Sequence, residues 1–110
     1  MANTFKRYVS QSIGTTPTTV GSYTVGASTQ TTLIGLTVAN RTASVISVDV
    51  QHNDGTNDTY IVKAAPGPAG SSLVVVGGDQ KVVMETNDSI KVTSDTATSA
   101  DVVMSLLEIT

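Results

Sequence analysis

The chain has 110 residues, the size of a single domain, and a net charge of −3 with only 14% charged residues. Its six basic residues are dispersed, which excludes a protein that binds nucleic acid through clustered Lys and Arg. It contains no cysteine, which excludes disulfides and thiolate metal sites.

Threonine and valine are abundant along the chain, and both are β-branched residues that favour strands. No window combines the apolar spacing of a helix with an absence of turn residues. Turn-forming residues recur about every 8–12 residues, as in β-sandwiches and barrels. The sequence therefore predicts an all-β, antiparallel sandwich. The expected strands span residues 5–13, 18–25, 31–39, 43–52, 58–64, 71–76, 80–86, 89–94 and 100–109.

The first 17 residues are predicted to form an extended N-terminal arm or edge strand, and residues 18–110 the sandwich domain. The opening lacks the apolar core of a secretory signal, and no apolar run reaches the ~20 residues of a membrane span. We therefore expect a soluble chain made in a cytoplasm. Phe5 and Tyr8 either insert into a pocket of a partner or cover the core of their own domain. Deleting residues 1–13 is expected to weaken assembly while the sandwich stays folded.

Three segments alternate apolar and polar residues with the period of two that marks half-buried strands. Their apolar members are assigned to the core. They are Ile34, Leu36 and Val38, then Ile46, Val48 and Val50, and finally Ile90 and Val92.

Polar residues gather in the stretch HNDGTND, which begins at His52. His52 is interpreted as a solvated turn histidine, because no serine with an orienting acid is recognisable around it. The carboxylates and amides of residues 53–58 are oxygen ligands, yet the bidentate glutamate of an EF-hand loop is missing. Asn and Gly favour a hairpin loop here, with a calcium site as the less favoured alternative.

No catalytic residue, cofactor or metal site is predicted, so we expect a protein that is not an enzyme. Residues 66–70 are read as a loop that passes a sheet edge, and Gly77-Gly78-Asp79 as a tight turn.

Three segments are apolar without alternation: residues 74–76, residues 82–84, and residues 102–104 together with 106–107. One interpretation is a central strand whose outer face lies under a loop. The favoured one is an outer face buried against a neighbouring subunit, because a small domain can cover few strands twice. The predicted assembly contacts are Phe5, Tyr8, Val9, Val74, Val76, Val83, Val103 and Leu107.

Five motifs along the chain form a recognisable set. They are MANTFKR at 1–7, YTV at 23–25, LIGLTVAN at 33–40, PGPAGSSL at 66–73 and DVVMSLLEI at 101–109. With these motifs the sequence resembles small virion proteins of tailed bacteriophages, including those of marine and cyanobacterial phages. The resemblance spans essentially the whole chain, although Gly26 stands where many members have proline.

The resemblance implies a β-sandwich, immunoglobulin-like or jelly-roll-like, that assembles in many copies on a virion as capsid decoration or as a neck, collar or tail component. It implies partners among copies of itself and other virion proteins, and none among nucleic acids, membranes or small-molecule substrates. A neighbour is expected to receive the N-terminal arm as an added strand. The alternative is a host-surface binding module that recognises sugar or protein through loop 53–58 or loop 66–70.

Overall fold

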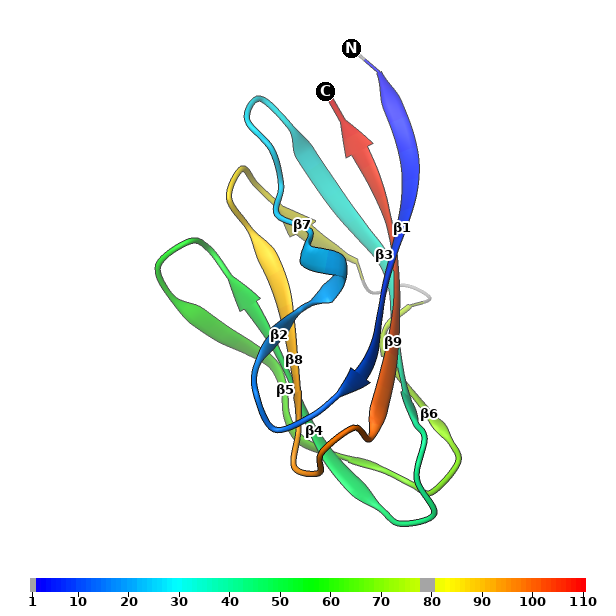
Figure 1. Ribbon diagram of the computed structural model, residues 1–110. Coiled ribbons are helices and arrows are strands. Elements are labelled where there is room, and N and C mark those ends of the chain that lie inside the picture. Colours follow the sequence, from blue (N-terminus) through cyan, green and yellow to red (C-terminus); the bar gives the residue numbers. More distant parts are fainter. Residues whose placement is uncertain (1, 78–80) are drawn as a thin grey trace.

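The computed structural model describes residues 2–77 and 81–110, which form two antiparallel sheets packed face to face (Figure 1). The described residues contain no α-helix and a single 3-10 turn, η1 (Val20–Ser22). The predicted all-β sandwich is confirmed. Its strands are β1 (Asn3–Ile13), β2 (Thr18–Thr19), β3 (Gln30–Asn40), β4 (Ile46–Asn53), β5 (Asp58–Gly67), β6 (Ser72–Val76), β7 (Val82–Met84), β8 (Ser89–Ser94) and β9 (Ala100–Ile109).

The strand order is that of a jelly roll. One sheet has the order β1-β9-β3-β6, with β7 also paired to β3, and the other has the order β2-β8-β4-β5. The pairings β1–β9, β2–β8, β3–β6 and β4–β5 join early strands to late ones, as if one long hairpin had been rolled up. In an immunoglobulin sandwich the first strand pairs with the second instead, so the jelly-roll expectation is the one that this connectivity matches.

The core lies between the two sheets. It is built from the inward-facing side chains of strands in which buried and exposed residues alternate. Val48, Val50, Ile90 and Val92 are at most 1% exposed, as their alternation predicted. Ile34 was assigned to the core incorrectly, since it is only half-buried. A bulge in β3 between Leu33 and Gly35 reverses the alternation at this point, so that Leu33 takes the buried position.

The predicted strand 18–25 is wrong over most of its length. Only Thr18 and Thr19 pair with β8, and the chain then turns through Gly21 and Ser22, whose φ angles are +58° and +55°. Two successive residues in the left-handed region interrupt the extended backbone of a strand. The turn leads the chain into positions where Tyr23 and Val25 are buried.

The N-terminal segment is an edge strand rather than an extended arm. β1 pairs with β9 from Asn3 to Ile13, with one bulge between Ser10 and Ile13 (Figure 1). Ile13 is 2% exposed, and the Tyr8 ring stacks on Tyr23 with 4.5 Å between ring centroids. Of the two interpretations of Tyr8, the one in which it covers its own core is correct.

The predicted strand 80–86 is shorter, since β7 covers only Val82–Met84. Gly78, Asp79 and Gln80, which include most of the predicted turn at 77–79, lie outside the described residues. The predicted strand 43–52 begins later, at Ile46, and β5 extends to Gly67.

Candidate functional site: the outer face of the five-stranded sheet

The outward side chains of the five-stranded sheet form two rows that run across its strands. Within a row, each residue is paired directly with the next residue of that row on the neighbouring strand. The first row is Phe5, Leu107, Thr32 and Val83, and the second is Val9, Val103, Thr37 and Val74. Each row contains three apolar residues and one threonine. We call these eight residues the outer face.

The outer face carries most of the exposed apolar surface of the described chain. Five of the seven large hydrophobic residues that are exposed lie on it. They are Phe5 (76% exposed), Val83 (68%), Val74 (65%), Val103 (50%) and Val9 (45%). Together they expose on the order of 500 Å² of apolar surface, at the upper end of what a monomer shows as one patch. A surface of this kind is typical of a contact site.

A hollow lies between the two rows. Here Ser105 stands opposite Gly35 on one side and Arg7 on the other, so two small residues lie beside the longer Arg7 side chain. The hollow has a volume of about 380 Å³. It is lined by Phe5, Lys6, Arg7, Ile34, Ser105 and Leu106. The face therefore presents a protruding ring, Phe5, beside a recess.

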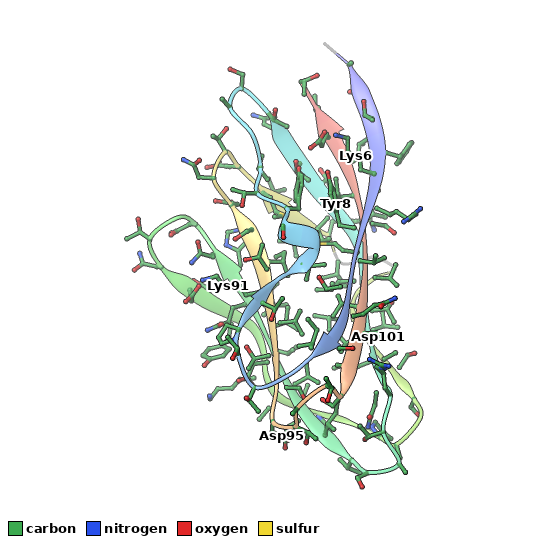
Figure 2. The ribbon with its side chains drawn as sticks, viewed as in Figure 1. Lys6, Tyr8, Lys91, Asp95 and Asp101 are labelled. Carbon is green, nitrogen blue, oxygen red and sulfur yellow. The ribbon has the colours of Figure 1, made fainter. Side chains whose placement is uncertain are left out.

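Six of the eight predicted assembly residues lie on the outer face. They are Phe5, Val9, Val74, Val83, Val103 and Leu107. The choice of Tyr8 and Val76 as surface contacts is wrong. Tyr8 points between the sheets (Figure 2), and Val76 is only 1% exposed. A register shift between Val74 and Val76 leaves both Val75 and Val76 buried, so Val74 alone of the valine triplet faces outward.

A polar network behind the outer face fixes β1 to the rest of the sheet. The Tyr23 hydroxyl donates to Glu108 Oε2 at 2.7 Å and lies 2.9 Å from Thr31 Oγ1. On the other side of the carboxylate, Lys6 Nζ lies 3.0 Å from Glu108 Oε1. Burial raises the pKa of Tyr23 to about 12, and the hydrogen bonds from Tyr23 and Lys6 lower the pKa of Glu108. The network ties β1, β3 and β9 together at the level of Phe5.

Charged side chains border the outer face at the Ala100 end of β9. Asp101, labelled in Figure 2, accepts a hydrogen bond from the Ser12 amide at 3.0 Å and lies 3.6 Å from Arg41 Nη1. Arg41 also donates to the Ser12 hydroxyl. The outer face therefore combines two apolar rows with charged side chains, Arg7 between the rows and Asp101 with Arg41 at the border. Contact surfaces between proteins also combine apolar and polar groups, with Arg enriched among them.

His52 lies in β4 rather than in a solvated turn. Its side chain is 22% exposed, and its Nε2 lies 3.0 Å from Asp88 Oδ2. Asp88 also accepts a hydrogen bond from the Glu85 amide at 2.8 Å. In the described part of the chain, no serine or threonine hydroxyl bonds to His52. The pair links β4 to the turn that precedes β8.

Several polar groups of loop 53–58 form hydrogen bonds within the loop. Asp54 accepts from the amides of Thr56 and Asn57 at 3.0 and 2.7 Å, and these backbone bonds lower its pKa. Asn53 donates to Asp58 at 2.6 Å, which is the main reason that the pKa of Asp58 is lowered. The loop thus has the hairpin role that its sequence predicted. Among the described residues, no group of three or more His, Asp or Glu is placed to hold a metal ion.

Comparisons with protein-family models, with curated proteins and with solved structures found no match to this chain. Within residues 2–77 and 81–110, no helix has the length and apolar character needed to cross a membrane. A functional proposal for this chain therefore starts from its own residues.

Proposed function

We propose that this chain is a structural protein of a tailed-phage virion, which assembles in many copies on the particle exterior through the outer face. The observation that carries the proposal is the concentration of exposed apolar side chains on that one face. Burying them removes apolar surface from water, which is the main favourable term in protein association.

The area of the outer face suits a second copy of the chain as its partner. Four strand positions about 4.8 Å apart and ten residues of about 3.3 Å each give a face of about 600 Å². Two such faces in contact bury about 1,200 Å², the lower limit of a standard protein–protein interface. Sheets pack face to face in this way within sandwiches, about 10 Å apart.

The shape of the outer face also suits a copy of itself. A two-fold contact uses the same patch on both subunits, so the patch must be complementary to itself. Phe5 is 76% exposed at one edge of the face, and it borders the hollow that Ser105 also lines. A buried aromatic ring in such a pocket is a common centre of binding energy.

The virion role is supported by the resemblance of the sequence to phage virion proteins and by the jelly-roll connectivity. Viral capsid domains use this connectivity, and so do lectin domains. The low charge of the chain, 14% of residues, limits repulsion between copies packed at high density. Against a host-surface binding module, the side chains of Asn53, Asp54 and Asp58 in loop 53–58 are engaged in their own turn.

The self-assembly is tested with Val83→Lys and the matched variant Val45→Lys. Val83 is 68% exposed on the outer face, and Val45 is 66% exposed outside it. A lysine on the face must lose hydration on contact, so Val83→Lys should weaken association at least about tenfold. Light scattering across a range of concentrations measures the molar mass. Equal association of both variants with the wild type would contradict the use of this face.

The virion location is tested separately by quantitative mass spectrometry of purified phage particles that carry this gene. We expect the chain at a copy number comparable to a major virion protein. Its presence in the infected lysate but not in the particles would contradict the proposal. Binding to host glycans on an array, lost when loop 53–58 is replaced, would favour the binding module instead.

A further inference from the structure

We infer that the free edge of β1 pairs with the same edge of a second copy, so that two five-stranded sheets join into one continuous sheet. This inference rests on the proposed function only in assigning self-assembly to the chain. It concerns a different surface, namely the backbone along one edge rather than the side chains of the outer face.

The direction of each backbone group of β1 follows from its pairing with β9. The amide of Ala2 donates to the Thr110 carbonyl, and the amide of Thr110 donates to the Ala2 carbonyl, each at 3.0 Å. The register continues without a shift from Asn3 to Ser10. In an antiparallel pair, residues that exchange hydrogen bonds alternate with residues that do not. The even-numbered residues therefore bond to β9, and the backbone groups of Asn3, Phe5, Arg7 and Val9 point to the free side.

These outward groups have no partner in the part of the chain that the structure describes. Four consecutive donor–acceptor positions on a regular strand form a template for another extended chain. β1 contains no proline, and its side chains in this stretch alternate regularly between the two faces of the sheet. The free edge of β1 from Asn3 to Val9 therefore presents an unbroken row of backbone donors and acceptors to another strand.

The other described sheet edges are interrupted in the ways that prevent such pairing. β2 has two residues, β6 five and β7 three. β5 is long, but its register shifts near Val62, Ala64 has a φ of +53°, and Pro66 has no amide donor. Among these edges, β1 alone combines length with a regular backbone.

A second β1 is the occupant that fits, because an antiparallel pair of identical strands is related by a two-fold axis perpendicular to the sheet. The axis keeps both outer faces on the same side, so pairing would double the apolar face to about 1,200 Å². Like charges directly opposite each other are unfavourable. We therefore expect a register that does not place the two copies of Arg7 opposite one another.

The test is amide hydrogen exchange of the full-length chain, followed residue by residue by NMR at increasing protein concentration. The amides of Phe5, Arg7 and Val9 should exchange rapidly in dilute solution. Once the copies pair, their exchange should be at least about tenfold slower. Lys6 and Tyr8 should be protected at every concentration. Rapid exchange of the three odd-numbered amides at all concentrations would overturn the inference, whether or not the chain associates.

Two variants separate this contact from the outer face. Arg7→Pro removes an outward amide and leaves the hydrogen bonds to β9 in place, whereas Arg7→Ala removes only the charge. Edge pairing should be lost in the first and kept in the second. Val83→Lys should keep the protection of Phe5 and Val9 even if face contacts are lost. Should protection arise only when other virion proteins are added, the occupant is a different strand and the pairing of two copies is wrong.

Discussion

Gly21 is held against β1 more closely than any side chain would allow. A Cβ atom placed on it would lie 2.6 Å from Tyr8 Cβ, and its φ of +58° is in the left-handed region. Its amide also donates to Ser10 Oγ at 2.8 Å. The glycine therefore lets η1 pack directly on the strand that presents Phe5 and Val9 outward.

We predict that Gly21→Ala lowers the free energy of unfolding by about 3 kcal/mol, through left-handed strain and the clash with Tyr8. Gly70→Ala is the matched control. Its φ is +65°, and no atom lies within 4 Å of the added Cβ. In that variant the left-handed strain alone should lower the free energy of unfolding, by about 1 kcal/mol. Urea unfolding measures both values, and equal losses would show that the contact with Tyr8 is unimportant.

Glu108 is predicted to make the fold sensitive to acid. The hydrogen bond from Tyr23 and the contact with Lys6 lower its pKa below the ordinary value of 4.5. A depressed pKa adds stability that is present above the unfolded value and is lost as the pH falls through the folded one. Stability should thus fall below about pH 4.5, and Glu108→Gln should reduce the slope. Thermal unfolding from pH 7 to pH 2.5 measures how steeply the stability falls with pH. The same slope in Glu108→Gln and in the wild type would contradict this role.

At the scale of the strands, the period-two alternation predicted which face of β4 and β8 is buried. It works there because the pairing of β4 with β8 has no register shift over the paired stretch from Val48 to Asn53. It failed at Ile34, where a bulge places two successive steps of β3 against one of β9. A comparable shift buries Val76, which the sequence had placed among the outward contacts. The apolar pattern does not encode such a bulge, because it records the side chains and not the partner strand.

The candidate face itself was partly predictable. Valines that break the alternation, such as Val74, Val83 and Val103, indicated a second apolar face before any pairing was known. The recess beside Phe5 and Ser105 was not predictable, since it depends on the register that sets Ser105 opposite Gly35 and Arg7. For β1 the sequence left an extended arm and an edge strand as alternatives. Its pairing with β9, which decides for the edge strand, involves the backbone, and the side-chain pattern does not record it.

The deletion of residues 1–13 now has a different expected result from the one that the sequence suggested. It removes Ile13 and Tyr8 from the core and exposes the edge of β9. We expect the free energy of unfolding to fall by about 3–5 kcal/mol, or the truncated chain to fail to fold. Phe5→Ala, which removes only an exposed ring, should lose no more than about 0.5 kcal/mol. Circular dichroism melting compares them, and a truncated chain with the wild-type melting temperature would contradict the place of β1 in the sandwich.

At the scale of the whole molecule, the rolled topology separates two kinds of surface. The described residues extend over 45 × 27 × 21 Å, with the outer face on one side and the hairpin loop 53–58 at the far edge of the other sheet (Figure 1). The fold thus exposes an apolar face and a regular edge together on the β1 side. A subunit with two such surfaces can form assemblies larger than a dimer.

The most direct measurement of the central claim uses single cysteines, because the chain has none of its own. Val83→Cys, Val103→Cys and the control Val45→Cys would each be labelled with a maleimide in dilute and in concentrated solution. If the outer face is the contact surface, labelling should be at least about tenfold slower at positions 83 and 103 in the associated form, with no change at position 45. Unchanged labelling of all three in an associated sample would show that the outer face stays in water and is not the contact surface.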